Sequence, residues 1–411
     1  MIDPLFELSR QMIRRISRPY HRPWAKEGRF RGRCNLVTGQ RGVGKTTLMV
    51  QYLSQKFPDH ATSRRCLYLP ADHFVVAQRP LYEVAEAFVH QGGQLLCIDE
   101  IHKAEAWARD LKSMVDTWDG LELLVTGSSL LHLQRGSHDL SRRVVLHRLE
   151  GFTFREFLEL RHGLRFPGLA LGKLLRSHEI WAEQIVQTLR ERGLFILAEF
   201  RSYLQAGFYP YFTEYEDLAS FQITLQQSVR ATLEADLPAL HPNLTGSTVA
   251  RIRRLLSAIA ANVPFTPDLT KLRHLLHIAD DRTLKEYLTI LEDAGLILVL
   301  RRSGGAMRSM KKPDRIYLGD PNLAYGLAAP EKADLGSVRE TFFVRALKGS
   351  HDVRAGSKGD FIVDGVTHFE IGGKNKGSRQ IAGLPQAFLA LDDIPAGSGS
   401  RIPLWLFGFV A

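Results

Sequence analysis

The spacing of apolar residues predicts a parallel α/β sheet between residues 36 and 150. Five short apolar runs are candidate strands: residues 35–38, 65–69, 94–99, 122–126 and 143–149. Three stretches between them have apolar residues at helical spacing: residues 46–56, 80–91 and 104–118. Strands that alternate with helices of this length are typical of βαβ crossovers, and such crossovers build parallel sheets.

The residues on either side follow other patterns. Residues 1–35 predict a basic helix over 5–17 and then a linker broken by Pro19 and Pro23. Residues 151–244 are helical and aromatic, and we expect them to form a helical lid. Its predicted helices are residues 152–158, 180–192, 198–205 and 219–234, with a tight turn at 207–210.

The pattern changes again at residue 245. Three helical segments precede two strands, and this order predicts a winged helix with a basic, glycine-rich wing; the segments are residues 246–262, 269–277, 281–294, 296–300 and 315–318. The remaining residues predict a small α/β domain with a helix at 337–347 and strands at 360–363, 367–371 and 403–410.

A glycine-rich loop joins the first predicted strand to the first predicted helix of the sheet. Its residues are Gly39, Gln40, Arg41, Gly42, Val43, Gly44, Lys45, Thr46 and Thr47. They match the phosphate-binding pattern G-x-x-x-x-G-K-[ST] in the context that the pattern requires. Glycine permits the positive φ angles that turn N–H groups toward an anion, and the helix that follows begins beside it. We expect Lys45 to contact the β- and γ-phosphates of a nucleoside triphosphate and Thr46 to contact Mg²⁺.

Two acids end the third predicted strand. Asp99 and Glu100 follow an apolar run, at the end of a buried parallel strand where ligands bind. Alone, such a pair is often only a strand end. Together with the loop, it predicts Asp99 in the Mg²⁺ shell and Glu100 as the group that orients and deprotonates the attacking water.

Two more sets of polar residues belong to the same region. The fourth predicted strand ends in hydroxyls, and we expect Thr126, or as a second choice Ser128, to hold the lytic water and report the γ-phosphate. A helix N-cap is the alternative. Arg142 and Arg143 precede the fifth strand. One of them could complete a neighbouring subunit's site as an arginine finger, or make only a surface salt bridge.

Composition limits the class of protein. The chain has 411 residues, of which 45% are hydrophobic and 24% charged, as in a folded globular protein with several domains. It has no run of 18 apolar residues and no signal-peptide pattern. Cys34, Cys66 and Cys97 lie far apart in apolar runs. This pattern indicates buried free thiols in a protein of a reducing compartment. We therefore expect a cytoplasmic protein without membrane insertion.

The formal net charge is +10, and residues 1–60 hold twelve Lys or Arg against four acids. Such a segment can bind nucleic acid, an acidic membrane surface or an acidic partner, or it can be a solvated helix face. Because no base-reading motif accompanies it, DNA is one candidate partner among several.

The order of these motifs resembles that of a family of prokaryotic AAA+-type ATPases. The resemblance rests on residues 39–47, 98–103, 126–129, 140–143 and 152–157. It implies a P-loop ATPase domain, a winged helix and a C-terminal domain similar to restriction endonucleases. The expected divisions are residues 1–35 (basic segment), 36–150 (ATPase domain), 151–244 (helical lid), 245–325 (winged helix) and 326–411 (nuclease-like domain).

The resemblance also implies ATP and Mg²⁺ as cofactors. Lys45 and Thr46 become the nucleotide and metal ligands. Asp99 and Glu100 match the Walker B pair, and Thr126 matches the sensor. The adjacent His102 matches as well, either as a link from the site to a neighbouring element or as a structural histidine.

A nuclease of the restriction-endonuclease type needs two carboxylates for Mg²⁺ and a lysine that stabilises charge. The candidates here are Glu340, Asp360, Glu370 and Lys374, with Asp364 as another acid nearby. Gly372 occupies the usual lysine position; Lys374 and Lys376 follow it closely and could replace that lysine, although a shift of two residues moves a side chain about 6–7 Å along a strand. Three interpretations stay open: an active nuclease, a degenerate nuclease-like domain that binds DNA or protein, and a structural domain.

The predicted winged helix gives little support for sequence-specific DNA recognition. Its expected recognition helix begins beside Asp280, and acids there oppose contact with phosphate. The wing has five basic residues: Arg301, Arg302, Arg308, Lys311 and Lys312. These suit a DNA backbone, so we expect non-specific or protein-mediated contact.

The leading hypothesis is a Mg²⁺-dependent ATPase that acts as a nucleotide-driven switch on the attached winged-helix and nuclease-like domains. One alternative is a DNA-processing protein in which ATP gates the nuclease-like domain. Another is a nucleotide-bound signalling scaffold with little turnover. A protein partner and a homo-oligomer both stay open.

Overall fold

The computed structural model describes residues 2–25, 29–128, 140, 142–240, 244–262, 269–278, 280–301, 313–327 and 333–411. Contacts divide the chain into two units. The first contains Met1–Gly151 and Glu234–Leu244, and the second contains Phe152–Leu233 and Thr245–Ala411. Each unit has its own buried apolar core.

The first unit is built on a five-stranded parallel sheet. Its strands are β1 (Cys34–Gly39), β2 (Cys66–Pro70), β3 (Leu95–Asp99), β4 (Glu122–Ser128) and β5 (Val145–Arg148). Their order is β2-β3-β4-β1-β5, and every neighbouring pair is parallel. The predicted α/β class is therefore confirmed for this unit. The order places β4 between the loop strand β1 and the acidic strand β3, so the ends of all three strands meet at one edge.

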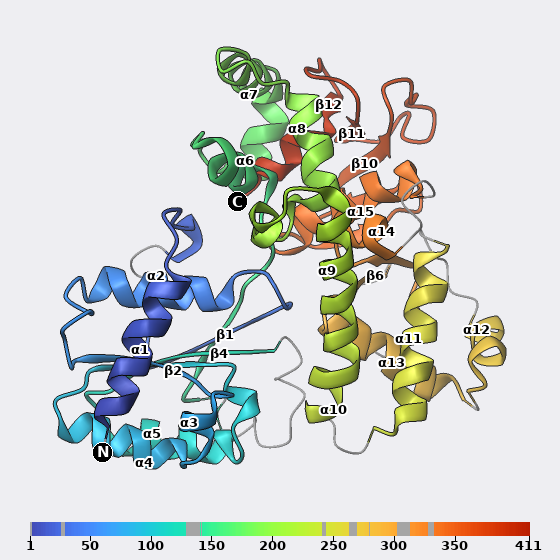
Figure 1. The fold of residues 1–411 in the computed structure, drawn as a ribbon. Helices are drawn as coiled ribbons and strands as arrows, with labels where there is room; N and C mark the ends of the chain where they lie inside the picture. The colour runs from blue at the N-terminus through green and yellow to red at the C-terminus, as the bar shows by residue number, and fades with distance from the viewer. Residues whose placement is uncertain are drawn as a thin grey trace. The chain divides into compact units, whose positions relative to one another are not determined.

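Helices cover both faces of this sheet, which explains why its inner strands are buried along nearly their whole length. The α-helices are α1 (Asp3–Ile16), α2 (Lys45–Lys56), α3 (Phe74–Ala77), α4 (Leu81–His90), α5 (Trp107–Thr117) and α10 (Leu237–Leu240). Two 3-10 turns, Pro23–Ala25 and Ile101–Lys103, also belong to this unit. Figure 1 shows α2 on one side of the sheet and α4 with α5 on the other.

The basic helix predicted at the start of the chain is present as α1. Leu5, Phe6 and Ile13 are buried, and Ser9 accepts a hydrogen bond from the backbone N–H of Tyr68 in β2 at 2.9 Å. Arg14 and Arg15 are exposed on it. The helix therefore packs on the sheet by one face and presents basic residues on another.

The second unit begins with helices, as expected. These are α6 (Phe154–His162), α7 (Leu171–Arg190), α8 (Ile196–Ser202) and α9 (Leu218–Ala231), with π-helical turns at Tyr203–Gly207 and Thr232–Asp236 and a 3-10 turn at Pro210–Glu214. Thr153 and Glu156 form a capping box at the start of α6. Helix α7 begins at Leu171, earlier than the predicted 180, because its first turns are also amphipathic.

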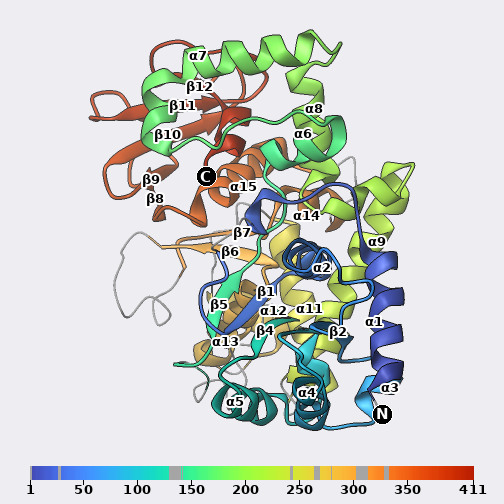
Figure 2. The ribbon, with the colours of Figure 1, turned by 90° about the vertical axis from the view of Figure 1, so that its left-hand side faces the viewer.

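Three helices and a hairpin follow in the predicted order. The helices are α11 (Gly246–Ala260), α12 (Leu269–Leu276) and α13 (Asp281–Asp293), and the antiparallel strands are β6 (Ile297–Leu300) and β7 (Arg315–Leu318). Figure 2 shows β6 and β7 side by side. Asp280 caps α13 by accepting a hydrogen bond from Thr283 N at 2.8 Å. The expected wing residues Arg302, Arg308, Lys311 and Lys312 lie outside the described residues.

The chain ends in a mixed sheet. Its elements are α14 (Pro321–Leu327), α15 (Leu335–Lys348), β8 (Val353–Ala355), β9 (Phe361–Val363), β10 (Thr367–Gly372), β11 (Ala387–Leu391) and β12 (Arg401–Pro403). The strand order is β12-β11-β10-β9-β8; β8, β9 and β10 pair antiparallel, whereas β10, β11 and β12 pair parallel. Phe343 of α15 packs on Phe369 of β10 with ring centroids 4.9 Å apart.

One predicted strand is wrong. Residues 403–410 were expected to be extended, but β12 ends at Pro403 and a 3-10 helix, Leu404–Phe409, follows. Every residue of that helix is buried. A fully buried apolar run has no periodicity that distinguishes a strand from a helix, so the pattern could not decide. Among the described residues, no helix is long and apolar enough to cross a bilayer.

Candidate nucleotide site

The loop between β1 and α2 has the backbone that its glycines predict. Gly42 and Gly44 have φ angles of 87° and 95°, a region that disfavours other residues. At Gly39, a Cβ atom would collide with the carbonyl oxygen of Leu149. Val43 is fully buried and anchors the loop. The loop is therefore held in one shape beside the first turn of α2.

Lys45 is buried at the start of α2, where its ammonium group lies against the loop. Its Nζ donates to the backbone oxygens of Gly39 at 3.0 Å and Gln40 at 3.1 Å. The same Nζ lies 4.0 Å from Glu100 Oε1. The lysine is thus placed between the loop and the acidic end of β3.

The Asp99 carboxylate accepts hydrogen bonds from three hydroxyl groups. Its Oδ2 accepts hydrogen bonds from Thr46 Oγ1 and from the Tyr68 hydroxyl, both at 2.8 Å. Its Oδ1 accepts from Thr126 Oγ1. All three donors are neutral, so they orient the carboxylate without pairing it with a positive charge. Burial, together with Asp99, raises the pKa of Tyr68 well above its usual range, so its hydroxyl stays a donor.

Glu100 follows Asp99 in a left-handed backbone conformation, with φ 53° and ψ 43°. That conformation is uncommon for a residue with a Cβ atom and is often found at functional sites. The Glu100 N–H donates to Thr126 Oγ1 at 3.0 Å. Burial raises the pKa of the Glu100 carboxyl, and the positive charge of Lys45 opposes the rise. A carboxylate whose pKa is raised in this way is a better proton acceptor near neutral pH.

His102 lies beside Glu100 as a neutral ring. Burial first, and then the positive charge of Lys103, lowers its pKa to about 4. Its Nδ1 accepts from Ser128 N at 3.4 Å, which assigns the ring proton to Nε2. That Nε2 lies 3.4 Å from Glu100 Oε2, a polar contact without hydrogen-bond geometry. His102 thus contacts both β4 and Glu100, and its role stays a prediction.

Thr126 is fully buried at the end of β4. Its hydroxyl donates to Asp99 and accepts from Glu100 N, so it joins the two acids of the pair. Its sensor role, like that of Ser128, stays a prediction. Among the arginines, Arg143 Nε donates to Asp116 Oδ1 at 2.6 Å, while Arg142 is exposed. The arginine-finger role of either one also stays a prediction.

Tyr68 and Asp236 belong to this site but were missed from sequence. Tyr68 lies within an apolar strand run, where an aromatic residue signals only packing. Asp236 is far along the chain from the loop, yet its carboxylate oxygens lie 3.6 Å from Arg41 Nη1 and 3.2 Å from Lys103 Nζ. No local sequence pattern distinguishes it from a solvated acid.

The donor set fits Mg²⁺ bound together with nucleotide phosphates. Thr46 offers a hydroxyl and Asp99 a carboxylate, 2.8 Å apart, beside the buried ammonium of Lys45. No group of three or more His, Cys, Asp or Glu side chains in the described residues is arranged to hold a metal alone. A P-loop site needs none, because phosphates and water supply the other ligands.

The second set of predicted site residues also gathers in one place, in the second unit. We call Glu340, Asp360 and Glu370 the carboxylate cluster. Arg315 Nη1 lies 3.5 Å from Glu340 Oε2 and 3.4 Å from Asp360 Oδ1. Lys376 Nζ lies 2.7 Å from Glu370 Oε1. Each acid of the cluster therefore faces a cation of the same chain.

The lysine of the cluster is Lys376 and not the expected Lys374. A Cβ atom on Gly372 would lie 2.6 Å from Lys376 Cβ, so the Lys376 side chain fills the space that a side chain at position 372 would use. Lys374 contributes its backbone oxygen to Arg401 Nη2 at 2.9 Å. Asp364 pairs with His351 Nδ1 at 2.7 Å instead of joining the cluster.

The carboxylate cluster does not fit a nuclease-type Mg²⁺ centre. Burial, and then the charge of Asp360, raises the pKa of Glu340 to about 7. The Tyr317 hydroxyl donates to Glu340 Oε2 at 2.6 Å, beside the guanidinium of Arg315. A divalent cation would have to displace that guanidinium to reach Glu340 and Asp360 together.

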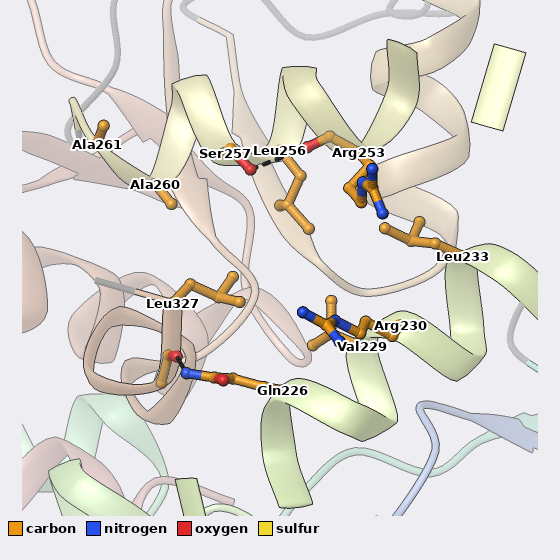
Figure 3. A pocket seen from close by; sticks show the side chains of 11 residues that line it. Gln226, Val229, Arg230, Leu233, Arg253, Leu256, Ser257, Ala260, Ala261 and Leu327 are labelled. Carbon is orange, nitrogen blue, oxygen red and sulfur yellow. Dashed lines mark hydrogen bonds between the residues drawn. The ribbon is translucent and has the colours of Figure 1, made fainter. Parts of the chain in front are cut away.

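The second unit also contains a hollow of about 480 Å³ between α9, α11 and α14. Figure 3 shows apolar side chains such as Leu256 and Leu327 around it, with Arg230 and Arg253 on its walls. Gln226 donates to Gly326 O at 2.6 Å within it. None of the residues predicted to act in catalysis lines this hollow.

Family comparison supports the P-loop assignment. A family model described as an AAA domain matches residues 31–158. A second, described as a domain of unknown function (DUF8612), matches residues 197–334. The chain therefore contains an AAA-type P-loop ATPase domain, followed by a region of unassigned function. No curated protein matches the sequence.

The solved structures that match this chain do so at low sequence identity and low TM-score. The Orc1 protein of Aeropyrum pernix in complex with DNA is 15% identical with a TM-score of 0.32, over 78% of this chain and 91% of that one. AMPPCP-bound DnaA from Aquifex aeolicus is 13% identical with a TM-score of 0.25, over 71% and 89%. C. elegans PCH-2 is 15% identical with a TM-score of 0.24, over 38% and 45%. Similarities this low support no conclusion about function.

Proposed function

We propose that this protein is a Mg²⁺-dependent ATPase that acts as a nucleotide-driven switch on a winged helix and a C-terminal α/β domain. One observation supports it above all. The hydroxyls of Thr46 and Thr126 both bond to Asp99, and Thr126 also bonds to the backbone of Glu100. Metal-binding and base-type residues from three elements thus form one connected network beside the phosphate-binding loop.

The residues divide the chemistry among them. The loop amides and the ammonium of Lys45 bind the phosphates, and the start of α2 favours their negative charge. Thr46 and Asp99 would hold Mg²⁺, which neutralises charge on the β- and γ-phosphates. Glu100 orients the attacking water and accepts its proton, with His102 beside one carboxylate oxygen. Thr126 bonds to both Asp99, which would hold the metal, and the backbone of Glu100, the proposed base, and so fixes their relative positions.

A phosphate-release assay tests this function. Lys45→Ala should abolish nucleotide binding and turnover, and Glu100→Gln should retain binding while turnover falls by roughly a hundredfold or more. Lys56→Ala is a matched control, because it removes a lysine from the other end of the same helix. Wild-type turnover equal to that of both site variants would disprove the proposal. Tight ADP retention with negligible turnover would favour the scaffold alternative instead.

A DNA-linked function is the second candidate. The observations behind it are the exposed Arg14 and Arg15 of α1 and the helix–helix–helix–hairpin order of α11, α12, α13, β6 and β7. Because Asp280 caps the start of α13, we propose backbone contact without sequence reading. Affinity for duplex DNA should fall steeply as salt increases, since the expected contacts are ionic. No binding at low salt would rule this candidate out.

We do not extend that candidate to nuclease activity. Arg315 and Lys376 occupy the cation positions of the carboxylate cluster, so the proposed role of the C-terminal domain is interaction and not cleavage. Incubating wild-type protein with plasmid, ATP and Mn²⁺ should leave the plasmid intact. Cleavage that disappears in Glu370→Gln would overturn this view.

A further inference from the structure

One short segment of the chain belongs to the first unit although its sequence neighbours do not. We call residues Glu234–Leu244 the return segment, because residues 152–233 before it and 245–411 after it belong to the second unit. Leu237 and Leu240 of α10 anchor the return segment by burying their side chains. Both of its ends therefore continue covalently into the second unit.

Asp236 connects the return segment to the nucleotide site. Its carboxylate is buried, with only 8% of the side chain exposed. One oxygen lies 3.6 Å from Nη1 of Arg41, in the phosphate-binding loop. The other lies 3.2 Å from Nζ of Lys103, three residues after Glu100. A single carboxylate thus spans the loop and the segment that follows the Walker B pair.

The pairing makes Asp236 sensitive to charge at the site. A buried carboxylate depends on its cations, and weakening one such pair leaves a charge uncompensated. Arg41 belongs to the loop that binds phosphate, and its side chain is 54% exposed, so it can turn toward a new anion. Lys103 has a side chain that is 29% exposed and is also able to move. A triphosphate brings more negative charge to the same loop than a diphosphate does.

We propose that Asp236 is a positioning residue that couples nucleotide occupancy to the return segment. Asp236 and the terminal phosphate compete for Arg41 and Lys103. When a triphosphate is bound, these cations shift toward it, the ion pairs of Asp236 weaken, and α10 loosens. A diphosphate competes less and leaves α10 held. This coupling rests on the proposed function only because it requires that the loop bind nucleotide. The element that the nucleotide regulates is the return segment.

Hydrogen exchange of the full-length protein tests the coupling. Peptides covering residues 234–240 are followed without nucleotide, with ADP and with a non-hydrolysable ATP analogue. In the wild type, exchange with the analogue should be on the order of tenfold faster than in the other two states, because local opening follows the weakened ion pairs. In Asp236→Asn, exchange should be fast in all three states. Equal wild-type exchange in all three, with nucleotide shown to be bound, would overturn the proposal.

Variants of Arg41 and Lys103, the two cations that pair with Asp236, test the proposal even if Asp236→Asn folds poorly. The double variant Arg41→Ala, Lys103→Ala should also lose the nucleotide dependence of exchange, although its return segment is unaltered. Asp236→Glu keeps the charge and should restore part of the dependence. Asp119→Asn is a control, because Asp119 is an exposed acid of the same unit that pairs with Arg33. Retained nucleotide dependence in the double variant would refute the competition.

Kinetics separate positioning from a general structural defect. In Asp236→Asn, both cations are released to the phosphates, so the KM for ATP should fall by about threefold. Damage to the fold would raise KM instead. If the wild type binds no nucleotide, the ATPase proposal fails and the coupling with it. If it binds and hydrolyses ATP while exchange is indifferent to nucleotide, only the coupling fails.

Discussion

The nucleotide site and the carboxylate cluster contain the same kinds of residue, but their carboxylates have different partners. In the nucleotide site, neutral hydroxyls from Thr46, Tyr68 and Thr126 hold Asp99. Its nearby lysine is occupied mainly by backbone oxygens. In the carboxylate cluster, cations face the acids directly at ion-pair distance.

The difference decides what each site can bind. A carboxylate held by hydroxyls keeps its charge available to a metal ion, because neutral donors orient it without neutralising it. A carboxylate that already faces a guanidinium or ammonium group has lost that capacity unless the cation leaves. The presence of several acids and a lysine is therefore a poor guide to metal binding. The nature of their partners is the better one.

The largest expected effect distinguishes the two sites by activity. Asp99→Asn should lower the ATP turnover roughly a hundredfold or more, because it removes the charge that would hold Mg²⁺. Glu340→Gln, in the carboxylate cluster, should leave turnover within about twofold of the wild type, since Glu340 belongs to the second unit and sites that share no partners are usually independent. Steady-state phosphate release measures both. A large loss in Glu340→Gln would show that the second region takes part in hydrolysis.

The next effect asks whether Arg315 stands in for a metal ion. Arg315→Ala should destabilise the protein by about 3 kcal/mol near pH 8, because Glu340 and Asp360 lose their shared partner. Added Mn²⁺ should raise the melting temperature of Arg315→Ala but not that of the parent. Both proteins are compared in an Asp99→Asn background, so that the nucleotide site does not respond. Equal Mn²⁺ stabilisation of both would mean that the guanidinium does not block the cluster.

The nucleotide site could be predicted from sequence because its signals are local. The loop, the two acids and the hydroxyl of Thr126 each lie at or just after the C-terminal end of a parallel strand, and such ends meet at one edge of the sheet. The strand order places β4 between β1 and β3, as the expected position of Thr126 requires. Tyr68 and Asp236 carry no such signal, because only tertiary packing brings them to the site.

The carboxylate cluster could be predicted only in part. Glu340 lies in α15, Asp360 directly precedes β9 and Glu370 lies in β10, three elements that the pattern located closely. Arg315 lies in the predicted hairpin, in a different part of the second unit's sequence, and nothing local connects it with Glu340. The choice of Lys376 over Lys374 depends on how the chain turns after β10. The expected strand at 403–410 failed for a related reason, since burial on all sides removes periodicity.

A smaller effect should appear in the dependence of stability on pH. Burial raises the pKa of Glu340 from 4.5 to about 7, so the folded state binds its proton more tightly than the unfolded state. This contribution to stability is full below pH 4.5 and is lost as pH rises through 7. Glu340→Gln should remove on the order of 2 kcal/mol of pH dependence across that range. Urea unfolding at several pH values, compared with wild type, measures it. Parallel curves for the two proteins would contradict the raised pKa.

The smallest effect concerns the space shared by Gly372 and Lys376. A Cβ atom at 372 would lie 2.6 Å from both Cβ and Cγ of Lys376, so Gly372→Ala must push the lysine aside. We expect a loss of about 1 kcal/mol in unfolding free energy, because the Cβ atom of Lys376 is fixed to the backbone and the turn after β10 has to shift with it. Lys376→Gly removes both of these atoms, so adding Gly372→Ala to it should then cost little, and a double-mutant cycle by urea unfolding measures the difference. Additive losses would mean that the two side chains do not compete for one space. A strong coupling would show that Lys376 can reach Glu370 because position 372 has no side chain. The ion pair of Glu370 would then depend on both Gly372 and Lys376.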